Sequence, residues 1–559
     1  MITQHILMVA SENDSLSGAK VGGIGDVLRD IPPALADLGC DVTTLVPSYG
    51  YLHTEQGATR LASVRFRHGQ AQHNAELYEV PGKAPRVGVR HLVLHHEVLR
   101  SLDPRTGHPR IYANDPSDRP FATDATRFAA FCSMVCAWLA SGDAPEFDCL
   151  HLHDWHTGHI PVLIQHDEAF RDLRGIRTVF SIHNLSLQGV RPFDDYTTTA
   201  APSAFYVWFP WLRGSAVDKA VVDPRWPTCC NPMAAGIRLA DAVHAVSPTY
   251  AEEILRPSMP ALGFFGGEGL ERDLQRARQQ GRLHGILNGL HYDVPTSAVP
   301  AKAPGVKSKA KAAAPAAPTP LTGLWPTLIE AARRWEESTD DPVHTVTRQR
   351  LEALQARGEP RFLLTSVSRV VAQKMGLLFT TPRREVRPAI ELILEAIDAQ
   401  RGVYVMLGNG LAEFEQQLAE LMNRSANFVF MKGYSNASAA ALYRHGHLFL
   451  MPSSFEPCGI SQLMAMREGQ PCLVHAVGGL RDTVEHGVTG FAFSGETPEE
   501  QASNMLRALQ RALDLHSGDA SAYQAMRQAA RQRRFPWEDS ARQYLAQLYA
   551  TGDRHGISV

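Results

Sequence analysis

The stretch KVGGIGDVLRDIP, from Lys20 to Pro32, places two adjacent glycines and then a third directly after the short apolar run HILMVA. An apolar run, a glycine-rich turn and a helical pattern in this order predict a strand that turns into a helix. A dinucleotide site requires Gly-x-Gly-x-x-Gly, but Leu28 stands where a third glycine should follow Gly23 and Gly25. This weakens a nicotinamide-binding interpretation. Two alternatives remain: an anion site at a helix start, with Lys20 beside it, or a plain structural turn.

The same alternation of strands and helices continues through the first half of the chain. Short apolar runs bounded by turn residues alternate with helical stretches such as residues 125–140. This pattern indicates βα units around a mainly parallel sheet. The apolar runs are HILMVA, VTTLVP, DCLHLH, TVFSIHN and AVHAVS.

A segment of different composition separates this half from a second α/β series. Residues 299–320, VPAKAPGVKSKAKAAAPAAPTP, contain Ala, Pro and Lys in place of large apolar residues, which predicts a weakly ordered insert. The second series begins at Arg361 with RFLLTSVSR and continues through VYVMLGNG, NFVFMKGY, HLFLMPSS and PCLVHA. Between them, a helical patch is predicted from the spacing of Leu324, Leu328, Ile329, Ala332 and Trp335.

We therefore predict two α/β domains, at residues 1–290 and 361–535, joined by a linker region at 291–360. Residues 536–559 are expected to form a C-terminal helix that packs one apolar face against another part of the protein. That face carries Trp537, Ala541, Tyr544, Leu545 and Leu548.

The composition is that of an ordinary soluble globular protein. Of the 559 residues, 44% are hydrophobic and 20% are charged, and the formal net charge is only −3, so neither a nucleic acid nor a membrane partner is indicated. No run approaches the roughly 20 apolar residues of a membrane span, and a cytoplasmic enzyme is expected. The eight cysteines are scattered without Cys-x-x-Cys spacing, which predicts reduced thiols.

Two polar stretches follow predicted strands in the first half. In HLHDWHTGH, His151 and His153 would share one face of a strand, which raises the possibility of a metal site, but Asp154 precedes a tryptophan where the two-metal hydrolase pattern requires a histidine. A polar cleft lining at a strand's carboxyl end is the favoured alternative. In SIHNLSLQG, His183 and Asn184 either line such a cleft or form a hydrogen-bonded loop corner.

Two further stretches in the second half combine charges with glycines. In SVSRVVAQKMG, Arg369 and Lys374 follow an apolar strand and could bind a diphosphate, although a solvated surface pair is the alternative. Between Pro452 and Val484, Glu456 precedes a glycine turn, and the pair Gly478 and Gly479 follows the strand CLVHA. A rigid carboxylate and a glycine nest can hold a sugar's hydroxyls and a phosphate together.

Taken together, these motifs resemble those of the bacterial glycogen synthase and plant starch synthase family, glycosyltransferase family five. The matching elements are KVGGIGDV, IYAND, HLHDWHTG, FSIHNLSLQG, HAVSPTYAEEI, GILNGLHYDV, SVSRVVAQK, KGYS, and FEPCGISQL followed by VGGLRDTV. They occur in the family's order over nearly the whole chain. The resemblance implies a GT-B architecture, with two Rossmann-like domains facing across a deep cleft, the acceptor glucan mainly on the first and the sugar nucleotide mainly on the second. It also implies that the terminal helix crosses back to the first domain.

The resemblance further implies transfer of glucose from ADP-glucose or UDP-glucose to the 4-hydroxyl at the non-reducing end of an α-1,4-glucan, with retention and without a metal or other cofactor. A retaining hydrolase would need two carboxylates about 5 Å apart, and no candidate pair is evident, so attack from the face of the leaving phosphate is expected. The sequence also lacks an Asp-x-Asp motif. The implied catalytic residues are His183, Arg369, Lys374 and Glu456; the donor-binding residues are Lys20, Gly22, Gly23, Tyr434, Gly478, Gly479 and Leu480; and Asp154, Tyr112, Asn184 and Cys458 line the glucose and the acceptor.

Some positions depart from the family's pattern. Met375 occupies the place of a usual glycine, and Val477 occupies the place of a usual threonine before the glycine pair. These changes leave two alternatives open: a retaining transferase with another donor or acceptor, and a non-catalytic glucan-binding or regulatory paralogue. The paralogue is expected to have lost one of Lys20, Arg369, Lys374 or Glu456, and all four are present.

Overall fold

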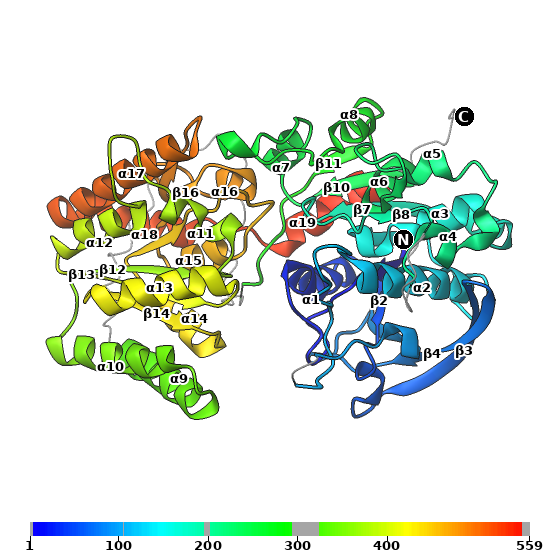
Figure 1. The fold of residues 1–559 in the computed structure, drawn as a ribbon, viewed down its shortest axis with the longest axis horizontal. Coiled ribbons are helices and arrows are strands. Elements are labelled where there is room, and N and C mark those ends of the chain that lie inside the picture. Colours follow the sequence, from blue (N-terminus) through cyan, green and yellow to red (C-terminus); the bar gives the residue numbers. More distant parts are fainter. Residues whose placement is uncertain (1–3, 104–105, 195–201, 293–322, 551–559) are drawn as a thin grey trace. The chain divides into compact units, whose positions relative to one another are not determined.

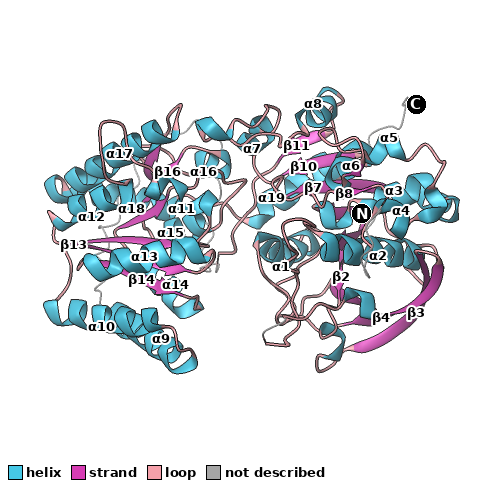
Figure 2. Ribbon diagram, viewed as in Figure 1, coloured by secondary structure: helices cyan, strands magenta, loops and turns pink. Residues whose placement is uncertain are grey.

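The computed structural model describes residues 4–103, 106–194, 202–292 and 323–550, which form two compact units. The first unit comprises the described residues of Met1–Ser258, Gly266–Gly289 and Pro536–Val559, and the second those of Met259–Phe265 and Leu290–Phe535. Each unit is an α/β domain in which helices pack on a largely parallel sheet (Figure 1, Figure 2). The predicted insert at 299–320 lies outside the described residues.

The first unit contains a nine-stranded sheet with the order β11-β10-β7-β6-β1-β2-β5-β4-β3. All neighbours from β11 to β5 are parallel, as the sequence predicts. From β1 the chain moves to β2 on one side and later to β6 on the other, so a topological switch point lies between β1 and β6. The strands are β1 (His5–Val9), β2 (Asp41–Pro47), β5 (Val89–His95), β6 (Cys149–His153), β7 (Arg177–Ile182), β10 (Ala242–Ala245) and β11 (Leu283–Gly285).

One edge of this sheet is an antiparallel hairpin that the apolar runs did not predict. It consists of β3 (Thr59–His68) and β4 (Ala71–Glu79), seen at the sheet edge in Figure 2. Only alternate side chains are buried, including Val64, Phe66 and Leu77. Because every second residue is polar, the strands contain no continuous apolar run.

Helices cover both sides of the first sheet. The helix α1 (Gly23–Ala36) begins at the glycine turn and buries Ile24, Val27, Leu28 and Ile31. The other helices of the unit are α2 (Ala122–Leu139), α3 (His159–His166), α4 (Phe205–Trp208), α5 (Asp218–Val221), α6 (Pro232–Leu239), α7 (Pro248–Glu253), α8 (Glu271–Gln279) and α19 (Trp537–Gln543). A short antiparallel pair, β8 (Arg191–Pro192) and β9 (Cys229–Cys230), forms a separate two-stranded sheet.

The C-terminal helix α19 (red in Figure 1) packs beside α1 (blue) in the first unit. Its side chains Trp537, Ala541, Tyr544 and Leu548 are buried in the same core cluster as α1. The last turn, Tyr544–Leu548, is a π-helix that delivers Tyr549 into the core as well. The apolar face predicted from the sequence is therefore the buried face.

The second unit contains a six-stranded parallel sheet with the order β14-β13-β12-β15-β16-β17. The chain leaves β12 first toward β13 and later toward β15, so the switch point lies between β12 and β15. The strands are β12 (Phe362–Val367), β13 (Gly402–Gly408), β14 (Phe428–Lys432), β15 (Leu448–Met451), β16 (Cys472–His475) and β17 (Gly490–Phe493).

The predicted helical patch is α9, and it packs against α10 (Figure 1). Leu324, Leu328 and Ala332 of α9 are buried, in agreement with their spacing. The helices of this unit are α9 (Leu324–Ser338), α10 (Pro342–Arg357), α11 (Ala372–Phe379), α12 (Ala389–Asp398), α13 (Ala412–Arg424), α14 (Asn436–His445), α15 (Ser461–Arg467), α16 (Gly478–Thr483), α17 (Pro498–Gly518) and α18 (Ala520–Gln532).

Two predictions from composition can be compared with the structure. All eight cysteines are free thiols, as predicted. Across the described ranges, no helix combines the length and the apolar character needed to cross a bilayer.

Candidate active site

Several of the predicted site residues follow the carboxyl ends of strands at or next to the two switch points. In the first unit, the segments after β1, β6 and β7 carry Lys20, Asp154 and His183. In the second unit, the segments after β12 and β15 carry Lys374 and Glu456. Open α/β sheets bind ligands at such places because the neighbouring loops run in opposite directions there.

The glycine turn of the first unit is organised by a carboxylate that the sequence analysis missed. Oε2 of Glu12 accepts hydrogen bonds from the backbone N–H groups of Val21 (2.7 Å) and Gly22 (2.6 Å). Its Oε1 accepts a hydrogen bond from the hydroxyl of Tyr112 at 2.6 Å. Glu12 is 2% exposed, so it forms a fixed internal support for the turn. Its only sequence signal is its position just after the strand HILMVA.

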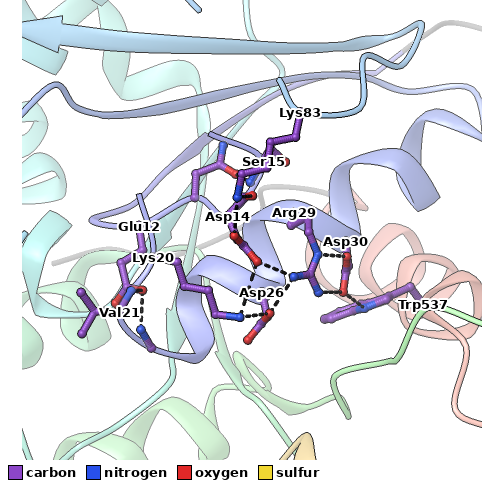
Figure 3. A network of polar contacts seen from close by, with 12 residues as sticks. Glu12, Asp14, Ser15, Lys20, Val21, Asp26, Arg29, Asp30, Lys83 and Trp537 are labelled. Carbon is purple, nitrogen blue, oxygen red and sulfur yellow. Dashed lines mark hydrogen bonds and ion pairs between the residues drawn. The ribbon is translucent and has the colours of Figure 1, made fainter. Parts of the chain in front are cut away.

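Lys20 is held by carboxylates on either side of the turn (Figure 3). Its Nζ atom lies 2.5 Å from Oδ1 of Asp26 and 3.5 Å from Oδ2 of Asp14. Burial lowers the pKa of Lys20, but the two carboxylates outweigh that effect and raise it above its ordinary value. With 37% of its side chain exposed, Lys20 remains accessible to a soluble anion.

Gly23 is the first residue of α1, and Gly22 is its N-cap. The N–H groups of a first helical turn have no acceptor within the helix, which favours an anion there. A Cβ atom on Gly23 would meet nothing within 4 Å, whereas one on Gly25 would lie 3.1 Å from Cγ of Lys20. Gly25 therefore lets the Lys20 side chain pack closely on the helix.

Asp154 adopts a backbone conformation that only glycine adopts readily, with φ 56° and ψ −178°. Its Oδ1 accepts a hydrogen bond from the backbone N–H of His183 at 2.7 Å. Burial raises the pKa of Asp154 to about 7, although the N–H groups of His183 and Asn184 act in the opposite direction. The side chain of Asp154, on a strained backbone, thus connects the segments after β6 and β7.

His183 and Asn184 form the tip of that second segment. Nε2 of His183 lies 2.9 Å from Nδ1 of His153, and burial lowers the pKa of His183 to about 3, so the ring is neutral. Oδ1 of Asn184 accepts a hydrogen bond from the N–H of Ser186 at 3.0 Å. The asparagine therefore shapes the loop corner, and both side chains are partly exposed.

Below these loops, a chain of buried hydrogen bonds crosses three strands. Nε2 of His244 lies 3.0 Å from the Ile286 carbonyl, which can only accept, so this nitrogen carries a proton. The neutral ring then accepts at Nδ1 from the Ser181 hydroxyl (2.7 Å), and Ser181 accepts from Nε2 of His151 (2.6 Å). Nδ1 of His151 consequently accepts from the Tyr549 hydroxyl (2.7 Å). Each proton in this series of hydrogen bonds therefore has one position that is consistent with all of the contacts.

The histidines of HLHDWHTGH are used in these contacts and in aromatic packing. His151 and His153 stack at 4.4 Å between ring centroids, and His156 packs on Trp155. Within the part of the chain that the structure describes, no group of three or more His, Cys, Asp or Glu side chains is arranged to hold a metal ion.

In the second unit, Lys374 and Glu456 form a direct ion pair. Nζ of Lys374 contacts Oε2 of Glu456, which also accepts a hydrogen bond from the Ser453 hydroxyl at 3.0 Å. Burial lowers the pKa of Lys374, and the positive charge of the nearby Arg369 adds to this effect. The residue predicted to bind the phosphate and the residue predicted to bind the sugar are therefore in contact with each other.

One residue of α11, Gln373, connects this helix to the segment after β15. Its side-chain Nε2 donates a hydrogen bond to the backbone carbonyl of Phe455 at 2.6 Å. Its backbone carbonyl accepts one from the N–H of Ser454 at 2.9 Å. These two bonds fix the first turn of α11, which carries Lys374, against the segment that carries Glu456.

Gly478 and Gly479 pack directly on the backbone that carries Glu456. A Cβ atom on Gly478, which has φ +43°, would lie 1.9 Å from the Glu456 carbonyl oxygen, and one on Gly479 would lie 2.3 Å from that of Cys458. The N–H of Gly479 donates to the Glu456 carbonyl at 3.1 Å, and that of Leu480 to the Val477 carbonyl at 3.1 Å. In this structure, both of these N–H groups are therefore hydrogen-bonded to backbone carbonyls of the protein.

The remaining predicted residues occupy different environments. Tyr434 is 59% exposed and follows β14, two strands away from β12, so it lies apart from Lys374 on the same edge of the sheet. Cys458 is buried in the loop against Gly479. Met375 is 1% exposed in the hydrophobic core, where its side chain fills volume that a glycine would leave empty.

Two known protein families match successive parts of the chain, one in the region of the first sheet and the other in the region of the second. The starch synthase catalytic domain family matches residues 5–276, and the glycosyl transferases group 1 family matches residues 375–511.

Individual relatives match along nearly the whole chain. A glycogen synthase of Anaeromyxobacter dehalogenans (strain 2CP-1 / ATCC BAA-258) is 33% identical over 559 residues, covering 98% of this chain and 99% of the relative. A glycogen synthase of Vibrio atlanticus (strain LGP32) is 29% identical over 558 residues, with the same coverage. The catalytic domain of starch synthase IV from Arabidopsis thaliana, solved with ADP and acarbose bound, has a similar fold, with a TM-score of 0.68 at 23% identity and coverage of 98% and 99%.

Proposed function

Because the chain belongs to the glycogen synthase family of glycosyltransferases, we propose that it transfers glucose from ADP-glucose to the non-reducing end of an α-1,4-glucan. Family membership establishes a glucosyltransferase that acts on a glucan, whereas the donor's nucleotide is part of the proposal. The ADP in the Arabidopsis starch synthase structure supports an adenine nucleotide.

The observation that carries the proposal is the buried pair of Lys374 and Glu456 beside Arg369. Donor binding supplies each member of the pair with a new partner. The ammonium then binds the diphosphate together with Arg369, and the carboxylate accepts hydrogen bonds from glucose hydroxyls. Cations placed where negative charge grows on the leaving phosphate stabilise the transition state.

In the first unit, the proposed roles follow the same logic. Lys20 and the first turn of α1 bind donor phosphate oxygens, and Gly22 and Gly23 leave the space for close approach. His183, Asp154 and Asn184 line the reacting glucose and its acceptor. Because His183 is neutral, it can donate or accept a hydrogen bond without adding charge to the sugar.

We also propose retention of the α configuration through attack on the same face that the nucleotide leaves. A double displacement needs a carboxylate free to attack the sugar. Glu12 and Asp154 of the first unit are instead engaged by backbone N–H groups. Glu456 is engaged by Lys374 in this structure and by the glucose hydroxyls in the proposed donor complex. The departing phosphate then takes the proton of the attacking hydroxyl, and Arg369 and Lys374 supply the counter-charge without a metal ion.

Nucleotide release tests this function directly. Purified enzyme is incubated with ADP-glucose or UDP-glucose, with and without glycogen or maltooligosaccharide, and nucleotide release and chain elongation are measured. We expect glucan-dependent ADP release, with Glu456→Ala as the inactive control. Release of UDP alone would contradict the proposed donor, and inertness toward both donors would contradict the proposed reaction. Glucan binding without affinity for either sugar nucleotide would instead indicate a non-catalytic paralogue.

A further inference from the structure

Arg29 lies at the centre of the ionic network around the glycine turn (Figure 3). Its Nη1 atom is 2.5 Å from Oδ2 of Asp14 and 2.9 Å from Oδ1 of Asp26. Its Nε and Nη2 atoms bind the two oxygens of Asp30 at 2.7 Å and 2.8 Å. One guanidinium therefore contacts three carboxylates.

Two of those carboxylates also hold Lys20. Asp26 is its nearer partner at 2.5 Å and Asp14 the more distant one at 3.5 Å, and the other oxygen of Asp14 lies 2.7 Å from Nζ of Lys83. The network thus balances three cations, Lys20, Arg29 and Lys83, against three carboxylates, Asp14, Asp26 and Asp30.

Arg29 is more firmly fixed than Lys20. Its bidentate contact with Asp30 has the fork geometry that suits a guanidinium. Oδ2 of Asp30 also accepts a hydrogen bond from the indole Nε1 of Trp537 at 3.3 Å, which connects the network to the buried face of α19. Lys20 has a flexible stem and a single charged group, so it can change partners while Arg29 stays in place.

We propose that Arg29 is a positioning residue that neutralises Asp14 and Asp26, so that Lys20 can leave these carboxylates for the diphosphate of the donor. This inference rests on the proposed function of Lys20. When Lys20 moves to a phosphate, Arg29 and Lys83 remain as counter-ions for the carboxylates. Without Arg29, three carboxylates would face two cations, Lys20 would be held in place, and an approaching diphosphate would meet net negative charge.

The expected kinetic signature is a change in donor affinity. Lys20 leaves its carboxylates when the donor binds, before any bond breaks, so the cost is present equally in the bound ground state and in the transition state. A loss of this kind raises KM and leaves kcat nearly unchanged. Direct damage to the catalytic groups would lower kcat.

The test compares Arg29→Gln with the full-length wild type in three measurements: KM and kcat for ADP-glucose, the Kd of ADP by calorimetry, and the acetylation rate of Lys20 by peptide mass spectrometry without ligand. We expect Kd and KM to rise about 10-fold, since loss of one charge pair in a partly exposed site costs about one pKa unit of interaction. For the same reason, Lys20 should retain its proton more strongly and be acetylated several-fold more slowly. The matched control is Arg60→Gln, which removes a surface ion pair with Glu76 in the β3–β4 hairpin.

A second variant tests the charge balance from the opposite side. Asp14→Asn removes a carboxylate, so it should speed acetylation of Lys20, tighten ADP binding and restore most of the affinity of Arg29→Gln in the double variant. This variant keeps the test decisive if Arg29→Gln fails to fold.

The outcomes separate this inference from the proposed function. Unchanged Lys20 acetylation and ADP affinity in both variants of an active enzyme would overturn the role of Arg29. A fall in kcat at constant KM would overturn it as well. If the wild type is inert toward both sugar nucleotides, the proposed function fails, and acetylation of Lys20 still reports whether Arg29 governs its availability.

Discussion

The ammonium of Lys374 lies directly against the carboxylate of Glu456, and only 10% and 9% of their side chains are exposed. In this structure, each charge is the counter-ion of the other. Removing one member of a buried pair leaves an uncompensated charge, which costs more than removing both.

We therefore expect Lys374→Ala or Glu456→Ala to lower turnover by about 100-fold or more, because a preorganised charge at the reacting centre is lost. The double variant should lose much less than the product of the two single losses, because residues that act as a unit are not additive. Steady-state rates of the four enzymes check this prediction. Wild-type-like rates in both single variants would contradict the assignment of the site.

Asp154 should make stability depend on pH. Its pKa rises from 3.8 to about 7 on folding, so the folded state binds this proton more tightly than the unfolded chain. Its contribution to the free energy of unfolding is full below about pH 4 and is lost as the pH rises through about 7.

In urea titrations, the free energy of unfolding of the wild type should fall relative to that of Asp154→Asn by on the order of 3 kcal/mol between pH 4 and pH 8. Asp172→Asn, at a side chain that is 96% exposed, sets the baseline. A difference between wild type and Asp154→Asn that stays constant over this range would disprove the shifted pKa.

The glycine pair should not tolerate a side chain. A Cβ atom on Gly478 or Gly479 would overlap the backbone of the loop that carries Glu456. We expect Gly478→Ala and Gly479→Ala to lose stability by more than about 1 kcal/mol and to weaken ADP binding, because strain and overlap have to be relieved by moving that loop.

Gly518→Ala is the matched control for the glycine pair, because Gly518 is helical and a Cβ atom added to it would meet nothing within 4 Å. There we expect a neutral effect or a gain of up to about 1 kcal/mol. Melting temperatures and ADP titrations of the three variants measure the predicted differences in stability and in ADP binding. Equal behaviour of all three would show that the close packing is not required.

Tyr549→Phe should break the buried hydrogen-bond chain at its origin. The variant leaves Nδ1 of His151 buried without its donor, which costs about 1–3 kcal/mol in the free energy of unfolding. Tyr51→Phe removes a more exposed hydroxyl contact to the Gly18 carbonyl and should cost less. Urea midpoints compare the two variants. A loss in Tyr51→Phe that equals or exceeds the loss in Tyr549→Phe would refute the proposed chain.

Sequence reasoning located most of the parallel strands because each of these is a short apolar run buried on both faces, as in VYVMLGNG for β13, but it named no run for β5, β11 or β17. It missed the β3–β4 hairpin, where Val64 and Phe66 alternate with polar residues. It assigned Lys374 and Glu456 to one site but did not foresee their direct contact. The two residues are 82 apart along the chain, and the neighbouring positions of β12 and β15 bring them together.

The supporting charges were missed for a related reason. Glu12 and Arg29 belong to no regular pattern of apolar residues, and their roles depend on which groups the turn and α1 bring near them. Periodicity reports which face of an element is buried, but it carries no information about which carboxylate meets which N–H group or cation.

The placement of α19 also has a consequence for synthesis on the ribosome. The first unit needs Trp537, Tyr544 and Tyr549 to complete its core, so its folding can finish only after Tyr549 has been translated. The second unit, which lies almost entirely within one continuous stretch, can mature earlier. A nascent chain that stalls before residue 537 would therefore expose the apolar side of α1 to chaperones and proteases.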